Sequence, residues 1–306
     1  MSDATVSVLI PVKDAAATLE RLFASLSRQT LRPQEILVVD SASQDDTPAV
    51  LRRHGAKVIV ISAEAFDHAG TRSRMVREAQ GEIVVFLTQD AIPADDRALE
   101  LLVAALLQKD DIGCAYGRQI ATAKASVSAR FLRAFNYPPY SEIRSFAARE
   151  RLGFATIFCS NSFAAWRKSA LEKIGYFGDD TIFGEDCRAV AKLLEAGFCI
   201  AYAAEARVEH SHDYTLAEEF RRSFDIGVFH ARESWLLTTF GQPVGRGKGL
   251  VLKQSEELLR AGKIGTLAAT VCRNGMKALG YLLGRRYPLL PRRLCRLFSM
   301  NRRWWR

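Results

Sequence analysis

Residues 82–91 read EIVVFLTQDA, in which five consecutive apolar residues lead directly to Thr88, Gln89 and Asp90. A strand that is apolar throughout is typical of a parallel sheet covered by helices on both faces, because neither face of such a strand meets water. Ligand sites of open α/β sheets lie at the carboxyl ends of the strands. The stretch therefore predicts an α/β sheet with a lone carboxylate, Asp90, at its ligand-binding edge.

The first half of the chain repeats this alternation of short apolar runs and amphipathic stretches. Strands are predicted over 6–12, 35–40, 57–62 and 82–88, with helices over 17–29, 45–55 and 70–81. Strands joined by helices in this way form a doubly wound sheet. A further helix is expected over 95–108 and a strand over 112–116, whereas residues 118–155, rich in Arg and aromatic side chains, are expected to form a long irregular substrate loop.

Ordered elements are expected again after this loop. Residues 156–166 are mostly apolar, GEDCRAVAKLLEAG (184–197) has helical periodicity, 198–212 is typical of an extended segment, and a helix is expected from 216 to about 238. The predicted fold class is therefore α/β, with a Rossmann-like, mostly parallel sheet flanked by helices. We divide the chain into an α/β domain over 1–240 and a basic, helical C-terminal extension over 241–306.

The net charge of +9 is concentrated in the extension. Residues 246–306 hold 15 of the 43 Lys and Arg and 2 of the 34 Asp and Glu, so they carry about +13 and the remainder about −4. This distribution argues against a nucleic-acid-binding face on the body, while basic extensions bind nucleic acid or anionic lipid. PLLPRRLCRLFSMNRRWWR (288–306) has the composition of a helix in a lipid headgroup layer, so we expect it either to dock on the membrane or to pack on the body.

Cysteine spacing and apolar runs predict the compartment. The six cysteines show no close pairing and no C-x-x-C spacing, which argues against a disulfide framework and against a structural zinc site. MSDATVSVLIPV has no charged-then-apolar targeting segment, and no apolar run approaches the roughly 18 residues of a membrane span. We expect a cytoplasmic protein, soluble or peripheral on the cytoplasmic face of a membrane.

Other predicted strands also end in polar residues. Pro11 and Asp14 lie at the end of the first strand, and Asp40 ends the second. Because the carboxyl ends of parallel strands meet at one edge, we expect these residues to share a cleft with Asp90. No G-x-x-x-x-G-K-[ST] loop is present, and no G-x-G-x-x-G follows the first strand. A nucleoside diphosphate in this cleft would therefore be neutralised by a divalent cation and an arginine.

RVEHSHDYT (207–215) offers further metal ligands. Alternate residues of an extended strand share a face, so His210 and His212 project together. Carboxylate oxygens suit Mg²⁺, and Mn²⁺ also accepts imidazole. We expect this strand to complete a site for Mg²⁺ or Mn²⁺ with Asp90, leaving positions open for phosphate oxygens. The alternative is a pair of surface histidines at a strand end.

Glu185 and Asp186 begin the helix predicted over 184–197. Carboxylates at a helix N-terminus are favoured by the helix dipole, so one of the two has a sufficient role as a cap. A carboxylate in such a place is also suited to act as a general base toward a hydroxyl. The local pattern leaves both roles open.

Six motifs follow one another along the chain: IPVKDAAATLERLFASLSRQT, EILVVDSASQDDT, GTRSRM, FLTQDAIP, GEDCRAVAKLLEAG and EHSHDYT. With them, residues 5–235 resemble the family 2 glycosyltransferases of GT-A fold. FDHAGTRS, FLTQDAIP, AYGRQ and HSHDYT look most like the branch that contains bacterial rhamnosyltransferases. The resemblance implies that 1–240 is a GT-A catalytic domain.

The activity that the resemblance implies is an inverting transfer from a nucleoside diphosphate sugar, with L-rhamnose from dTDP-rhamnose as one candidate donor. The acceptor would be a hydroxyl of a glycan or of a lipid-linked saccharide in cell-surface polysaccharide synthesis. By the same resemblance Pro11, Asp14, Asp40 and Gln89 line the nucleotide pocket, and Arg72 lies near the base or the diphosphate.

The resemblance also implies the reacting residues. Asp186, with Glu185 beside it, matches the catalytic base of the family, and Asp90 with His210 or His212 matches the metal ligands, His210 being preferred. The Asp-x-Asp motif of the family is incomplete, because Thr88 stands in place of its first Asp. This departure keeps a second class of function open, a nucleotide-sugar or glycan-binding module without catalysis.

Overall fold

The structure, a computed structural model, describes residues 4–243, 249, 256, 259–260 and 264–305, and one sheet runs through it. The sheet has nine strands in the order β3-β2-β1-β4-β8-β6-β9-β5, with β7 also paired to β9. The strands are β1 (Val6–Val12), β2 (Glu35–Asp40), β3 (Lys57–Val60), β4 (Ile83–Leu87), β5 (Ile92–Pro93), β6 (Ile112–Ile120), β7 (Glu142–Arg144), β8 (Phe163–Arg167) and β9 (Cys199–Glu209).

Six of these strands run in one direction. β1 is parallel to β2 and β4, β2 to β3, and β6 to β9. β8 runs against both β4 and β6, and β5 and β7 run against β9. The predicted α/β sheet is thereby confirmed, and the carboxyl ends of β1, β2, β4, β6 and β9 lie along one edge.

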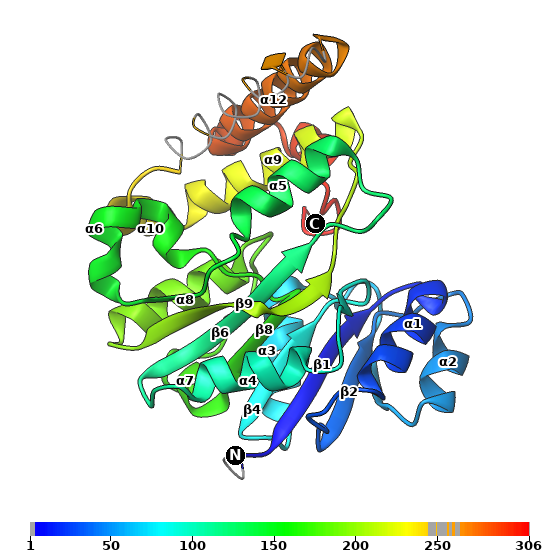
Figure 1. The fold of residues 1–306 in the computed structure, drawn as a ribbon. Coiled ribbons are helices and arrows are strands. Elements are labelled where there is room, and N and C mark those ends of the chain that lie inside the picture. The colour runs from blue at the N-terminus through cyan, green and yellow to red at the C-terminus, as the bar shows by residue number, and fades with distance from the viewer. Residues whose placement is uncertain (1–3, 244–248, 250–255, 257–258, 261–263, 306) are drawn as a thin grey trace.

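Helices cover both faces of the sheet (Figure 1). One face carries α1 (Ala16–Leu26), α2 (Thr47–Arg53) and α4 (Ala98–Leu107), and the other carries α3 (His68–Glu78), α7 (Lys168–Lys173), α8 (Glu185–Glu195), α9 (Leu216–Arg232) and α10 (Ser234–Phe240). Consecutive residues of β1 show why its sequence is apolar throughout. Val8 and Ile10 point into the core beneath α1, α2 and α4, whereas Leu9 points into the core on the opposite face of the sheet. All three residues are fully buried.

Residues 118–155 are not the irregular loop that was predicted. β6 continues to Ile120, and the segment then forms α5 (Val127–Asn136), β7, a 3-10 turn at Phe146–Ala148, α6 (Arg149–Leu152) and a second 3-10 segment at Gly153–Ile157. The Ser126 side chain begins α5 by accepting a hydrogen bond from the Ala129 backbone. The sequence VSARFLRAFN has the apolar periodicity of an amphipathic helix, although only Ala129 of α5 is buried in the structure.

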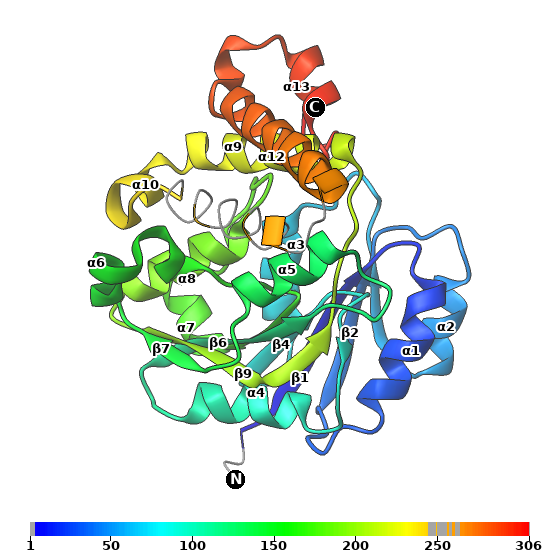
Figure 2. The same ribbon diagram turned by 45° about the horizontal axis from the view of Figure 1, so that its top comes forward.

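The C-terminal residues that the structure describes pack on α9 (Figures 1 and 2). α12 (Ile264–Arg285) crosses α9 at close range, because Gly227 of α9 and Gly280 and Gly284 of α12 leave no room for a Cβ against the opposing backbone. A 3-10 turn at Tyr287–Leu289 and α13 (Arg292–Phe298) then return Trp305 to the core beside α9.

In the described residues 288–305 the chain packs on the body as short pieces, one of the two alternatives expected for this segment. The parts of the predicted extension at 244–248, 250–255, 257–258 and 261–263 lie outside the described residues. No helix in the described part of the chain is long and apolar enough to cross a membrane.

Candidate active site

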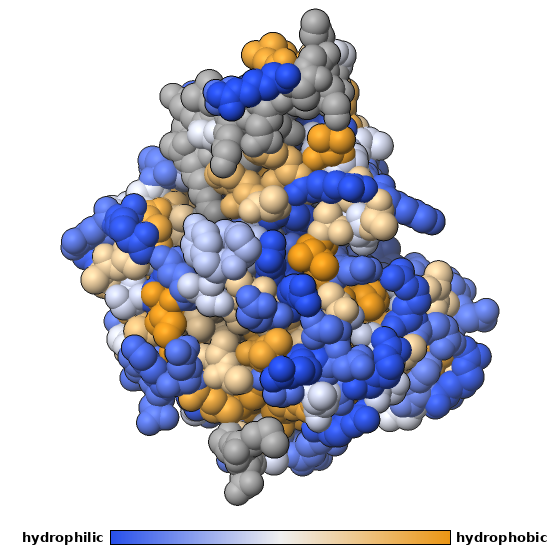
Figure 3. Space-filling view, viewed as in Figure 1, coloured by the Kyte–Doolittle hydropathy of each residue, from blue (hydrophilic) through white to orange (hydrophobic). Residues whose placement is uncertain are grey.

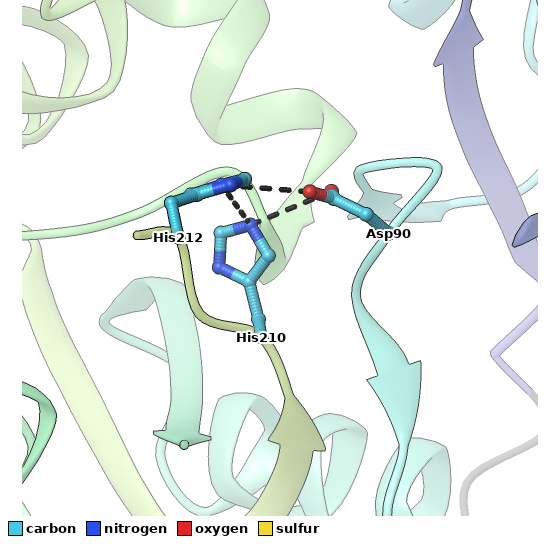
Figure 4. A group of neighbouring side chains, drawn as sticks. All are labelled: Asp90, His210 and His212. Atoms are coloured by element: carbon cyan, nitrogen blue, oxygen red, sulfur yellow. Dashed lines mark hydrogen bonds and ion pairs between the residues drawn. The ribbon is translucent and has the colours of Figure 1, made fainter. Parts of the chain in front are cut away.

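Asp90, His210 and His212 converge at the carboxyl edge of the sheet (Figure 4). Asp90 follows β4 and both histidines follow β9. The two histidine Nε2 atoms are 3.0 Å apart, and each lies 3.4 Å from one carboxylate oxygen of Asp90. The structure thus brings together the acid and the two imidazoles that the sequence placed in distant segments.

The donor set fits a divalent cation. Two nitrogens bound at about 2.1 Å to one ion, at right angles, lie about 3 Å apart, which matches the two Nε2 atoms. Burial, and then the charge of His210, lower the pKa of His212 to about 4, so its lone pair is free at neutral pH. Burial opposes the ionisation of Asp90, but the hydrogen bond and charge of His210 outweigh it and hold the pKa of Asp90 well below its usual range. An anionic oxygen beside imidazole nitrogens is a donor set that Mn²⁺ accepts.

Gln119, near the end of β6, holds the other side of the His210 ring. Its Oε1 lies 2.9 Å from His210 Nδ1 and also accepts a hydrogen bond from Arg133, while its Nε2 donates to Ser160 Oγ at 3.0 Å. An amide oxygen only accepts, so Nδ1 of His210 carries a proton and Nε2 is the ring nitrogen that would bind a cation beside Asp90. Sequence reasoning missed this residue, although it lies in the AYGRQ motif.

Asp186 lies at the start of α8 with part of its surface exposed. Gly184 precedes the helix at φ 74°, where a Cβ would overlap the Phe229 ring. Asp186 accepts hydrogen bonds from the backbone of Cys187 at 2.8 Å and of Asn161 at 3.2 Å. Burial, and then the charge of Glu185, nevertheless raise the pKa of Asp186 to about 7. A carboxylate that exchanges its proton near neutrality is suited to general base catalysis.

Glu185 and Arg72 form a buried ion pair behind Asp186. Arg72 Nη1 lies 3.3 Å from Glu185 Oε1, and Asn161 Nδ2 donates to the same oxygen at 3.3 Å. Burial opposes the ionisation of Glu185, but Arg72 and then His68 lower its pKa. Glu185 therefore stays charged and anchors the start of α8, which leaves Asp186 as the acid of the pair that is free to react.

The segment before β8 joins the base to the candidate metal ligands. Asn161 donates its backbone N–H to Asp186, and Ser160 accepts from the Gln119 that holds His210. Ser162 accepts a backbone hydrogen bond from Thr88, just before Asp90. Three consecutive residues thus link Asp186 to the neighbours of the Asp90–His210–His212 cluster through hydrogen bonds.

The residues predicted to bind the nucleotide gather at the ends of β1, β2 and β4. Pro11 lies near the end of β1, and Asp14 and Asp40 accept hydrogen bonds from the loop after β2. Gln89 accepts from the Lys13 backbone N–H at 2.8 Å and donates to the Lys13 carbonyl at 3.1 Å. Asp14 remains exposed, at a strained φ of 47°. Hydrophilic side chains gather on the surface between the part that carries α12 and the part that carries α1 and α2 (Figure 3).

The fold is that of solved glycosyltransferases of GT-A fold. The chain is similar to the mannosyltransferase PcManGT from Pyrobaculum calidifontis in complex with GDP-Man and Mn²⁺, with a TM-score of 0.62 and 17% identity over 94% of this chain and 88% of that one. It is also similar to glucosyl-3-phosphoglycerate synthase from Mycobacterium tuberculosis in complex with Mn²⁺ and UDP-glucose, with a TM-score of 0.53 and 20% identity over 79% and 80% of the two chains. At these identities the likeness shows the fold.

Sequence comparison gives the family. Residues 7–175 match the model of glycosyl transferase family 2. The O-antigen chain rhamnosyltransferase WbaN of Salmonella anatum is 38% identical over 98% of this chain and 95% of its own length. The O-antigen chain rhamnosyltransferase RfbN of Salmonella typhimurium strain LT2 is 37% identical over 98% and 96%. The chain belongs to glycosyl transferase family 2, and the resemblance drawn from its motifs is confirmed.

Proposed function

We propose that the protein is an inverting, cation-dependent rhamnosyltransferase that moves L-rhamnose from dTDP-rhamnose to a hydroxyl of a lipid-linked glycan in O-antigen-type polysaccharide synthesis. The sugar and the pathway class are supported by the two rhamnosyltransferases at 37–38% identity over nearly the whole chain. One observation supports the proposed chemistry. Hydrogen bonds of residues 160–162 link Asp186, whose pKa is raised to about 7, to the candidate cation ligands Asp90, His210 and His212.

The mechanism follows from these groups. Asp186 takes the proton of the acceptor hydroxyl while the oxygen attacks the anomeric carbon from the face opposite the diphosphate. The bond from the anomeric carbon to the phosphate oxygen breaks, its electron pair leaves with the nucleoside diphosphate, and one displacement inverts the centre. A divalent cation held by Asp90, His210 and His212 would supply positive charge against the charge that develops on the leaving group. A single reacting carboxylate suffices, because the diphosphate leaves without being protonated.

A donor panel tests this proposal. Release of nucleoside diphosphate is measured with dTDP-rhamnose, UDP-sugars and GDP-sugars, with Mn²⁺ and with a chelator. We expect release from dTDP-rhamnose that the chelator abolishes. Asp186→Asn removes the base and is expected to lose release while still binding dTDP, with the exposed Asp110→Asn as the matched control. Full release by Asp186→Asn would show that a different group takes the proton.

We also propose that the protein is peripheral on the cytoplasmic face of a membrane. The described residues 264–305 contain no Asp or Glu, and Arg286, Arg292, Arg293 and Arg296 are exposed there. Leu289 is 80% exposed, and Leu282 and Leu297 about half exposed. Exposed apolar side chains among arginines suit an anionic lipid surface. Trp304 and Trp305 pack on the protein core and are not part of this exposed surface.

Vesicle sedimentation tests the membrane proposal. We expect the protein to sediment with vesicles of phosphatidylcholine and phosphatidylglycerol but not with phosphatidylcholine alone. The triple charge reversal Arg292→Glu, Arg293→Glu and Arg296→Glu is expected to abolish this binding, because each arginine contributes about 1 kcal/mol near an anionic surface. Equal sedimentation of the triple variant and the unmodified protein would contradict the proposal.

A further inference from the structure

Arg72 has little charge left to offer a donor. It is buried and paired with Glu185, and its guanidinium also donates to the His68 carbonyl at 3.1 Å. A guanidinium neutralised in this way is a poor partner for a second anion. Arg72, which the resemblance places near the base or the diphosphate, therefore has less charge to offer a diphosphate than an arginine without a carboxylate partner.

Arg222 of α9 contacts two aromatic rings, one three residues before Asp186 in the chain and one stacked on His212. Its guanidinium carbon is 4.8 Å from the centroid of the Phe183 ring and 5.7 Å from that of Tyr214. Phe183 directly precedes the start of α8, where Asp186 lies, and the Tyr214 ring stacks on His212 with centroids 5.3 Å apart. An arginine that contacts aromatic rings can still donate its N–H groups to an anion.

Arg133 of α5 contacts Gln119, the neighbour of His210 in the same cluster. It donates to Gln119 Oε1, the atom that also faces His210 Nδ1, and its guanidinium carbon lies 5.8 Å from the Tyr137 ring centroid. Burial lowers the pKa of Arg133, which shows that its charge is poorly solvated. The charges of Arg133 and Arg222 both also help to lower the pKa of His212.

Neither cation is neutralised by the protein. Within the part of the chain that the structure describes, no carboxylate comes within 4.0 Å of Arg133 or Arg222, whereas Arg72 and Arg188 each have such a partner. Asp225, one turn along α9 from Arg222, accepts from the backbone of Met300 and Asn301 instead. Arg133 and Arg222, without a carboxylate partner among the described residues, therefore bring two positive charges to a cluster that holds a single carboxylate, Asp90.

We propose that Arg133 and Arg222 bind the diphosphate of the donor from two sides, next to Asp90, His210 and His212. Guanidinium groups pair with phosphate oxygens through charge-assisted hydrogen bonds, and a diphosphate offers enough oxygens for both. The inference rests on the proposed function for the identity of the donor, but the anion site itself does not depend on which sugar or base is bound.

Calorimetry with three probes tests the assignment: dTDP, thymidine and inorganic pyrophosphate, each in the presence of Mn²⁺. Arg133→Met and Arg222→Met keep most of the side-chain length and remove the charge. We expect each variant to bind dTDP and pyrophosphate about tenfold to a hundredfold more weakly, the usual loss for a hydrogen bond to a charged group. Binding of thymidine is expected to stay unchanged. Arg221→Met, next to Arg222 on α9, is the matched control and is expected to bind all probes normally.

The outcomes are distinct. The proposal is overturned if both Met variants bind pyrophosphate as tightly as the unmodified protein does. It is also overturned if the unmodified protein binds no pyrophosphate. A loss of thymidine binding as large as the loss of pyrophosphate binding would indicate general disruption and would likewise overturn it. Arg133→Lys and Arg222→Lys retain the charge and are expected to bind more tightly than the Met variants, so a folding defect in one variant does not hide the result. Pyrophosphate binding that depends on both arginines, without sugar transfer from any donor, would refute the proposed function and leave this inference intact.

Discussion

The pH dependence of sugar transfer gives a direct test of Asp186 as the base. With a pKa of about 7, raised by burial and by Glu185, about a tenth of the molecules carry ionised Asp186 at pH 6 and about nine tenths at pH 8. The acceptor loses its proton only to the ionised form, so kcat/KM is expected to rise roughly tenfold between these pH values, with its midpoint near pH 7. Initial rates of nucleoside diphosphate release from pH 5.5 to 8.5 measure this rise in kcat/KM.

The Glu185→Gln variant tests whether this rise in kcat/KM reports the ionisation of Asp186. The substitution removes the negative charge that is the largest cause of the raised pKa after burial, and it frees Arg72, whose charge lowers the pKa of Asp186. Both changes move the midpoint to lower pH, while burial keeps it above that of an ordinary aspartate. A midpoint that is the same in Glu185→Gln and in the unmodified enzyme would refute the reasoning, and the exposed Glu172→Gln serves as the control.

Asp186→Asn separates catalysis from folding. Loss of a general base typically lowers the rate by about a hundredfold to ten-thousandfold. Because the pKa of Asp186 is raised on folding, its contribution to stability is present below its unfolded pKa and is lost as the pH rises through about 7. The Asn variant is therefore expected to be inactive, yet more stable than the unmodified protein at pH 8 in urea unfolding. Inactivity together with lower stability would point to a structural role.

Three further predictions follow from named contacts. Asp90→Asn removes the anionic ligand and is expected to weaken Mn²⁺ binding more than tenfold by electron paramagnetic resonance, with thymidine binding unchanged. Gln119→Leu leaves His210 Nδ1 without its acceptor and is expected to weaken Mn²⁺ binding about tenfold to a hundredfold, whereas Gln119→Glu restores it. Gly284→Ala forces a Cβ against the Phe224 carbonyl and is expected to lower the free energy of unfolding by about 1–3 kcal/mol. At Gly275 an added Cβ meets no neighbouring atom, so Gly275→Ala is expected not to lower the free energy of unfolding.

The sheet and the metal-ligand cluster could be predicted because their causes are local. A strand buried on both faces must be apolar at every position, which is why 82–88 predicts a central strand and Asp90 at its end. His210 and His212 alternate along an extended segment that leads to the same edge. The convergence of these residues needed only the rule that parallel strands end at one edge.

The charge partners could not be predicted, because they depend on packing between distant segments. Nothing in GTRSRM shows that Arg72 pairs with Glu185 rather than with a ligand, and both residues had been assigned to the reaction. Arg133 lies in a helix with a single buried residue, and Arg222 lies in a run of Arg on α9 that any solvated helix could carry. Their placement beside His212 is visible only once α5 and α9 are folded over the end of β9.

Gln119 gives a physical reason for the cation site and the diphosphate site to act together. Its Oε1 has two lone pairs, and His210 and Arg133 each approach this same atom. A displacement of Arg133 toward a bound diphosphate changes the acceptor that orients His210, and a cation on Nε2 of His210 strengthens the donation from its Nδ1. Binding energies linked in this way are reciprocal, so Mn²⁺ tightens dTDP by the same factor by which dTDP tightens Mn²⁺. That factor is expected to shrink in Gln119→Leu, because the atom that both groups share is then missing.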